Sequence, residues 1–82
     1  MRDANAIRAA AREAIVEMTG AAVSDDEPLI SSGRIDSLSV VKLILLLERK
    51  LHVSLPSGSL QPDDFDTIDW IVETVERVAV PQ

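Results

Sequence analysis

The chain has 82 residues, with 14 acidic side chains against 8 basic ones, a single His and no Cys. This length fits one small domain over residues 1–82, with little room for a deep catalytic pocket. The absence of Cys excludes a disulfide, a Cys-based zinc site and a thiol nucleophile, and a single His excludes a His-rich metal site. Packed side chains must therefore supply the stability. Most of them are aliphatic, because aromatic residues make up only 2% of the chain.

The net charge of −6 disfavours nucleic acid and anionic membranes as partners, since phosphate binding depends on clustered Lys and Arg. The longest apolar run, Leu43–Leu47, is too short to span a bilayer, and the first residues lack the apolar stretch of a secretory signal. We therefore expect a cytoplasmic protein with no membrane partner. The charge is uneven: residues 37–58 carry a net +2, whereas residues 59–82 carry a net −5.

The first periodic segment runs from about Ala4 to Thr19, where apolar residues at spacings of three and four predict one buried helix face. Asp3 is suited to cap its start, and Gly20 stands where a helix commonly ends in a left-handed residue. From Ala21 to Asp36 the periodicity is lost. A loop of this length in a small domain is expected to be pinned or functional. The expected pins are its apolar residues Leu29, Ile30 and Ile35.

The segment from Ser37 to about Lys50 or Leu51 predicts a second helix that is apolar over more than half of its circumference. Its broad apolar side consists of Val40, Leu43, Ile44, Leu47 and Leu51. A second apolar stripe lies beside it and consists of Leu38, Val41 and Leu45. A surface helix needs only one such stripe. The second stripe is therefore either covered by another helix or presented to a partner.

The remaining third of the chain predicts shorter elements. Residues 52–59 are a loop, and residues 61–65 are a single helical turn with Pro62 at its first position. Asp66 is expected to cap a last helix, in which the apolar residues from Ile68 to Val78 again follow helical spacing. The predicted fold class is therefore all-α: a small four-helix bundle with three main helices and a short third helix.

The sequence Gly33-Arg34-Ile35-Asp36-Ser37-Leu38 joins the long loop to the second helix. Asp36 and Ser37 are both suitable cap residues, at a helix N-terminus where a phosphate would be favoured. Taken alone, Asp-Ser-Leu is explained by Ser37 simply capping the helix. A Ser nucleophile needs an adjacent base, and His52 lies at the far end of the helix, roughly 20 Å away at 1.5 Å per residue. The two residues cannot form a catalytic pair within one subunit, so we expect a protein that is not an enzyme.

The run from Leu29 to Leu38 resembles the phosphopantetheine attachment region of the acyl carrier and peptidyl carrier proteins. The resemblance covers most of the chain: the first helix, the long loop, Asp-Ser-Leu before an apolar second helix, the turn near Pro62 and the last helix. Length, acidity and low aromatic content also fit this family. The resemblance implies an acyl-carrier-protein-like bundle in a stand-alone, monomeric carrier.

The resemblance also implies the site. Ser37 would receive a 4′-phosphopantetheine group from coenzyme A, and Asp36 would help to position the modifying phosphopantetheinyl transferase and its Mg²⁺. The thiol of the arm would hold acyl or aminoacyl groups as thioesters. An adenylating ligase or an acyltransferase would load it, and a downstream synthase or condensing enzyme would use the cargo. Four positions of the second helix would meet these partners: Leu38, Val41, Lys42 and Leu45. No residue of the chain is expected to bind a metal by itself.

The chain departs from the pattern of fatty-acid carriers, whose second helix is acidic. Here Glu48 is the only acidic residue of that helix, set against Lys42, Arg49 and Lys50. This favours a specialised pathway of polyketide or nonribosomal peptide type over a fatty-acid-synthesis role, unless these cations are only a solvated face. The other alternative is a non-catalytic helical interaction module that uses the second apolar stripe.

Three other features carry less weight. The acidic residues from Asp63 to Asp69 do not match the ligand spacing of a calcium-binding EF-hand, and helix capping and solvation explain them better. Trp70 is either a binding anchor or, as we expect, a partly buried residue of the last helix. His52 is expected to be an ordinary loop residue.

Overall fold

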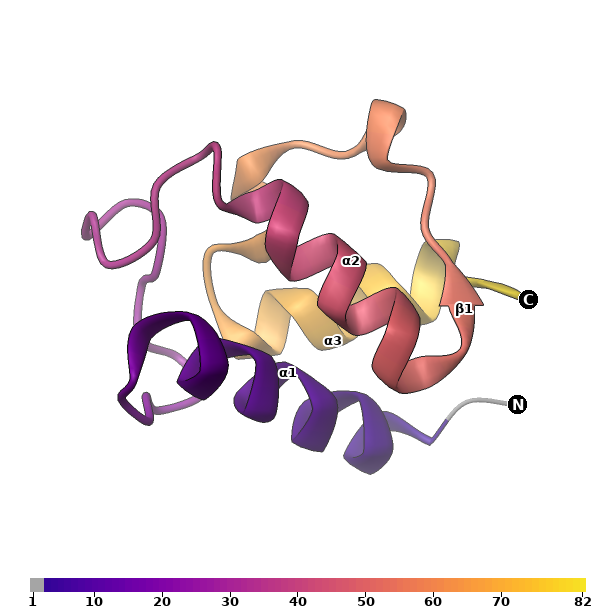
Figure 1. The fold of residues 1–82 in the computed structure, drawn as a ribbon, viewed down its shortest axis with the longest axis horizontal. Coiled ribbons are helices and arrows are strands. Elements are labelled where there is room, and N and C mark those ends of the chain that lie inside the picture. Colours follow the sequence, from indigo (N-terminus) through magenta and orange to yellow (C-terminus); the bar gives the residue numbers. More distant parts are fainter. Residues whose placement is uncertain (1–2) are drawn as a thin grey trace.

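The computed structural model describes residues 3–82, in which three α-helices, two short 3₁₀ turns and a small sheet follow one another (Figure 1). The elements are α1 (Ala4–Thr19), α2 (Val40–Leu51), β1 (Val53–Ser54), η1 (Ser57–Ser59), η2 (Pro62–Phe65), α3 (Ile68–Val78) and β2 (Val80–Pro81). Helix α1 packs against both α2 and α3. The turn η2 is the predicted short third helix, so the predicted all-α bundle is confirmed.

Both ends of helix α1 are capped. The Asp3 side chain accepts the Asn5 N–H at the start, and the helix ends at Gly20 with φ of 77°. Both ends agree with the sequence prediction.

The core is aliphatic, as the composition indicated. Within residues 3–82, the only aromatic side chain in the core is Phe65, at the end of η2. The fully buried core residues of the helices include Ile7, Ala11, Ala14, Ile15, Leu43, Leu47, Ile68, Ile71 and Val75.

Helix α2 begins at Val40, three residues later than predicted. Residues 37–39 form a turn instead, because the Ser39 N–H donates to both the carbonyl oxygen of Asp36 (3.1 Å) and its Oδ1 (2.8 Å). The backbone then continues into the helix, where the Leu43 N–H donates to the Ser39 carbonyl oxygen. Ser37 therefore lies in a turn just before the helix.

The N-cap of α3 is Thr67, so the prediction that Asp66 caps this helix is wrong. The Thr67 hydroxyl accepts the Trp70 N–H at 3.0 Å. The carboxylate of Asp66 is turned to the long loop, where it accepts hydrogen bonds from residues 29–31. The apolar spacing of α3 was predicted correctly, with Ile68, Ile71, Val72 and Val75 buried and Val78 partly buried.

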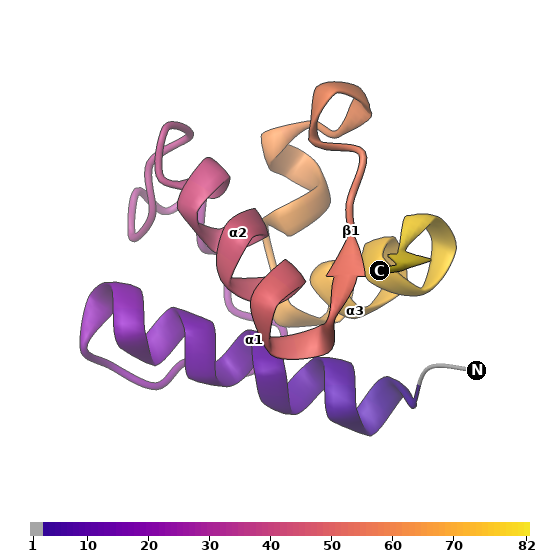
Figure 2. The ribbon, with the colours of Figure 1, turned by 45° about the vertical axis from the view of Figure 1, so that its right-hand side comes forward.

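A two-stranded antiparallel sheet closes one end of the molecule, and the sequence did not predict it. Val53 of β1 pairs with Pro81 of β2, and Ser54 pairs with Val80. Gln82 extends the pairing, since its side-chain amide donates to the Val53 carbonyl oxygen at 2.8 Å. Figure 2 shows β1 beside the last residues of the chain, with α1 running below them. The expected tail is therefore attached to the segment that follows α2.

Candidate functional site

The predicted site lies where the long loop enters α2, and its three central residues are all in contact with solvent. Asp36 and Ser37 are exposed, and the side chain of Leu38 is 84% exposed. Leu38 is the most exposed large apolar residue of the described chain. The turn therefore holds a hydroxyl group and an apolar side chain outward, side by side, at the start of a helix.

Asp36 is the residue that caps this turn. Its Oδ1 accepts the Ser39 N–H, and this bond is the main reason that the pKa of Asp36 lies below its ordinary value. The hydroxyl of Ser39 adds to the same effect. Asp36 is therefore ionised at neutral pH. Of the two predicted cap residues, Asp36 caps the turn and Ser37 does not, because within residues 3–82 the Ser37 hydroxyl forms no hydrogen bond with the protein.

The loop before the site is held in place by two kinds of contact. Two of the three predicted apolar pins, Leu29 and Ile35, are buried, whereas Ile30 is only partly buried against the core. Gly33 has φ of 81°, which allows the sharp turn between them. The Ile35 N–H donates to the Leu29 carbonyl oxygen at 2.9 Å and closes the loop on itself.

The second kind of contact comes from Asp66, which lies just before the N-cap of α3. Its Oδ1 accepts the N–H groups of Leu29 (3.2 Å), Ile30 (2.7 Å) and Ser31 (2.9 Å), and its Oδ2 accepts the Ser31 hydroxyl. The Ser31 N–H is the largest cause that lowers the pKa of Asp66. One carboxylate thus fixes the loop backbone to the segment that precedes α3. This long-range role could not be predicted from Asp63-Asp64-Phe65-Asp66, because these residues are also typical of helix capping.

Ser37 and His52 lie at opposite ends of α2, as expected. His52 is the C-terminal cap of the helix in a left-handed conformation, with φ of 55°, and its N–H donates to the Glu48 carbonyl oxygen. It is exposed to solvent. Within the part of the chain that the structure describes, no three His, Asp or Glu side chains gather in an arrangement that could hold a metal ion.

The second apolar stripe of α2 is uncovered in this structure. Val41 is 59% exposed and Leu45 is 53% exposed, and both follow Leu38 along the same side of the helix. Lys42 is exposed beside them. Three apolar side chains are therefore exposed along one side of α2 and of the turn before it, starting next to Ser37. Such surfaces commonly mark interaction sites.

One of the three cationic side chains of α2 is neutralised by ion pairs within the protein. Lys50 forms ion pairs with Glu13 and Glu17 of α1, and the hydrogen bond that it donates to Glu17 is the largest cause that raises the pKa of Lys50. Lys42 and Arg49 have no carboxylate within ion-pair distance among residues 3–82. The cationic side chains that remain for a partner are therefore these two.

None of the helices in residues 3–82 has both the length and the apolar character needed to cross a membrane. The long helix α1 alternates buried apolar residues with Arg and Glu on its exposed faces.

Comparison with known proteins identifies the family. Residues 9–77 match the family described as phosphopantetheine attachment site. The chain is 38% identical over 74 residues to the D-alanyl carrier protein of Streptococcus sanguinis, which covers 88% of this chain and 94% of that protein. It is 32% identical over 66 residues to the D-alanyl carrier protein of Lactobacillus delbrueckii subsp. bulgaricus, covering 78% of this chain and 82% of the relative. The chain therefore belongs to the family of phosphopantetheine-bearing carrier proteins, whose prosthetic group is 4′-phosphopantetheine.

Proposed function

We propose that Ser37 is the attachment residue and that the chain presents acyl or aminoacyl thioesters on the phosphopantetheine arm. The observation that carries this proposal is the free, exposed hydroxyl of Ser37 in the turn before α2. The residues present fit a phosphodiester. A negative group at residue 37 lies close to the positive end of α2, where anions are favoured. The exposed turn also leaves space for an enzyme to approach.

The attachment step needs a partner enzyme. The Ser37 Oγ would form a new bond to the pantetheine-side phosphorus of coenzyme A, while the pyrophosphate P–O bond breaks and adenosine 3′,5′-bisphosphate leaves. The hydroxyl proton passes to a base of the phosphopantetheinyl transferase, because His52 lies at the far end of α2. Asp36, ionised and adjacent, would help to position the transferase and its Mg²⁺. Once attached, the group supplies the thiol that holds the cargo.

The names of the relatives favour an amino acid as the cargo. D-alanyl carrier proteins carry D-alanine by name, so D-alanine is the first candidate for this chain. An aminoacyl cargo favours an adenylating ligase over an acyltransferase as the loading enzyme. It also favours the amino-acid branch of the specialised pathways over a polyketide pathway. A fatty-acid role is less favoured, because Lys42 and Arg49 are exposed on α2 in place of an acidic surface.

The exposed stripe of α2 is proposed as the docking surface for these partners. Leu38, Val41 and Leu45 would supply apolar contacts, and Lys42 would tune the approach of a partner, since rim charges act mainly on association rate and specificity. The surface begins one residue after Ser37. A partner seated there would therefore face the attached arm.

The attachment proposal is tested by intact-mass spectrometry. The apo-protein is incubated with coenzyme A, Mg²⁺ and a broad-specificity phosphopantetheinyl transferase. We expect a mass gain of one phosphopantetheine group in the wild type and in the matched control Ser39→Ala, and none in Ser37→Ala. A gain that persists in Ser37→Ala, or no gain in the wild type, would contradict the proposal.

The cargo is tested on the modified protein. With ATP and an adenylating ligase from a D-alanyl carrier system, we expect a thioester of D-alanine that hydroxylamine releases. Loading of malonyl groups by an acyltransferase, with no aminoacyl loading, would contradict the amino-acid assignment and leave the attachment result intact.

A second candidate is a plain helical interaction module, and the uncovered stripe of α2 is the observation that favours it. It predicts that Leu45→Asp abolishes partner binding while Ser37→Ala has no effect on any function of the protein. The carrier proposal predicts that Ser37→Ala abolishes cargo transfer. The two variants together therefore distinguish the candidates.

A further inference from the structure

Trp70 is a large aromatic side chain left at the surface, on a face of α3 that the carrier function does not use. Its side chain is 48% exposed, whereas the other aromatic residue of the chain, Phe65, is fully buried. Stepping about 100° per residue, Trp70 lies opposite the buried side of α3, which is formed by Ile68, Ile71 and Val75. Packing of the buried side into the core therefore leaves the indole facing solvent.

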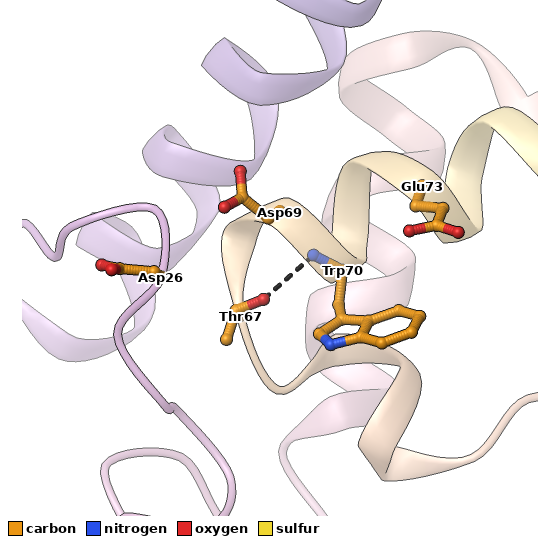
Figure 3. Close-up of a pocket in the computed structure, with 5 residues that line it drawn as sticks. All are labelled: Asp26, Thr67, Asp69, Trp70 and Glu73. Carbon is orange, nitrogen blue, oxygen red and sulfur yellow. Dashed lines mark hydrogen bonds between the residues drawn. The ribbon is translucent and has the colours of Figure 1, made fainter.

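Trp70 borders a hollow of about 320 Å³ whose other lining residues are Asp26, Thr67, Asp69 and Glu73 (Figure 3). Glu73 stands one turn along α3 from Trp70, and Asp26 lies across the hollow on the long loop. The Thr67 hydroxyl accepts the backbone N–H of Trp70, which fixes the start of the helix from which the indole projects. The hollow thus combines an aromatic wall with three carboxylates.

Of these three carboxylates, only that of Asp69 forms an ion pair within the described residues. Asp69 pairs with Arg8 of α1 at 2.6 Å. Asp26 and Glu73 are exposed, and in the described part of the chain no Lys or Arg lies within ion-pair distance of either. The hollow therefore keeps a negative charge that the protein itself does not neutralise. An aromatic face beside free carboxylates is complementary to a cation, and above all to a planar guanidinium, which stacks on indole and forms hydrogen bonds to carboxylates.

We propose that the surface formed by Trp70, Glu73, Asp69 and Asp26 is a second docking site, which receives an arginine-containing segment of a partner protein. The guanidinium stacks on the exposed indole and pairs with Glu73, the free carboxylate that lies beside the indole in Figure 3, while Asp26 adds negative charge on the far side of the hollow. This surface lies on α3 and the long loop, whereas the stripe next to Ser37 lies on α2. The proposal does not depend on the attachment of phosphopantetheine. It assigns a binding role to part of the negative charge of residues 59–82.

The test uses Trp70 as its own probe. The chain has one Trp and no Tyr, so its tryptophan emission reports on Trp70 alone. The full chain is titrated with a short peptide of alternating Arg and Gly, and separately with Lys–Gly and Glu–Gly peptides of equal length. We expect a saturable change in emission with the Arg peptide, weaker binding of the Lys peptide and no response to the Glu peptide. Equal responses to the Arg and Lys peptides, or none to either, would overturn the proposal.

Matched variants separate the hollow from the general acidity of the helix. Glu73→Gln should weaken binding of the Arg peptide by about two- to fivefold, the size expected for one exposed charge contact. Glu76→Gln removes the same charge from the same helix outside the hollow and should change binding much less. Equal losses in both variants would show unspecific attraction and contradict the site.

Trp70→Leu keeps an apolar side chain and removes the stacking surface. Binding is then followed by NMR shifts of the Glu73 and Asp26 backbone amides, with the thermal unfolding midpoint measured in parallel. We expect a folded variant that binds the Arg peptide about fivefold less tightly. Unchanged binding would overturn the role of Trp70. Tryptophan emission of the wild type that changes with protein concentration, in the absence of peptide, would show that a second copy of the chain occupies the hollow, and this would also contradict the proposal.

Discussion

Asp36 and Asp66 are both carboxylates that accept backbone N–H groups, but they act over different distances in the chain. Asp36 accepts the N–H of Ser39, three residues away, and shapes the turn that exposes Ser37. Asp66 accepts N–H groups more than thirty residues away and holds the loop that leads to this turn. The position of Ser37 thus depends on one local and one long-range hydrogen-bonding carboxylate.

Asp66→Ala should destabilise the protein by about 1–3 kcal/mol, because it leaves loop N–H groups without a charged acceptor. The free energy of unfolding is measured by urea denaturation. Asp63→Ala is the matched control, since Asp63 is an exposed carboxylate of the same turn, and its loss should have little effect. Equal stability of the wild type and Asp66→Ala would contradict a stabilising role of this carboxylate in holding the loop.

Helix α2 has two apolar sides with different fates. The broad side packs into the core through Leu43 and Leu47, whereas Val41 and Leu45 remain in solvent. The periodicity of the sequence predicted both stripes and left open whether the second was covered. Burial of one and exposure of the other show that only the first stabilises the fold. The exposed stripe is therefore free for the proposed docking.

Leu47→Ala should cost about 2–5 kcal/mol, because it removes a fully buried side chain and leaves a cavity. Leu45→Ala, an identical change on the exposed stripe, should alter stability by less than about 0.5 kcal/mol. Both values come from chemical denaturation of the two variants beside the wild type. A denaturation midpoint that Leu47→Ala leaves unchanged would mean that the core side of α2 is assigned wrongly.

At the scale of the elements, helical periodicity was a good guide and cap assignments were a weaker one. The spans of α1 and α3 follow the apolar spacing closely, because side-chain burial recurs with the helix turn. The starts of α2 and α3 differ from prediction where two suitable cap residues stand together. Thr67 rather than Asp66 caps α3, since the Asp66 carboxylate is used by the loop. Local sequence does not reveal such competition.

At the scale of the whole molecule, the features that could not be predicted from the sequence all join segments that are far apart in the chain. The sheet pairs Val53 and Ser54 with the last residues, and each strand has only two residues, too few to show an alternating pattern. The ion pairs of Lys50 with α1 likewise depend on tertiary packing. The candidate site was predictable because Asp36, Ser37 and Leu38 are adjacent in the chain. The hollow at Trp70 was not, since it unites α3 with the long loop.

The stability of the whole molecule should depend on acid pH. Three carboxyl groups have a pKa below the ordinary value in the folded chain: Asp25 through Arg12, Asp36 through Ser39, and Asp66 through Ser31. Such a group binds fewer protons in the folded state than in the unfolded state. Its stabilising effect is complete above the unfolded pKa, about 3.9 for Asp, and is lost as the pH falls through the folded pKa.

We therefore expect the thermal unfolding midpoint to change little between about pH 7 and pH 5 and to fall below about pH 4. Circular dichroism at a series of pH values measures this dependence. Asp66→Asn should have a shallower fall, because it lacks one of the three groups. A midpoint that rises on acidification would contradict the assigned direction of these pKa shifts.

Attachment of the prosthetic group to Ser37 is tested by mapping the group in protein that has been modified in cells. Trypsin cleaves after Arg34 and Lys42, so the peptide of residues 35–42 holds both Ser37 and Ser39. Fragmentation of this peptide by tandem mass spectrometry assigns the group to one serine. We expect phosphopantetheine on Ser37. Its presence on Ser39, or on any other peptide of the chain, would contradict the proposed attachment site.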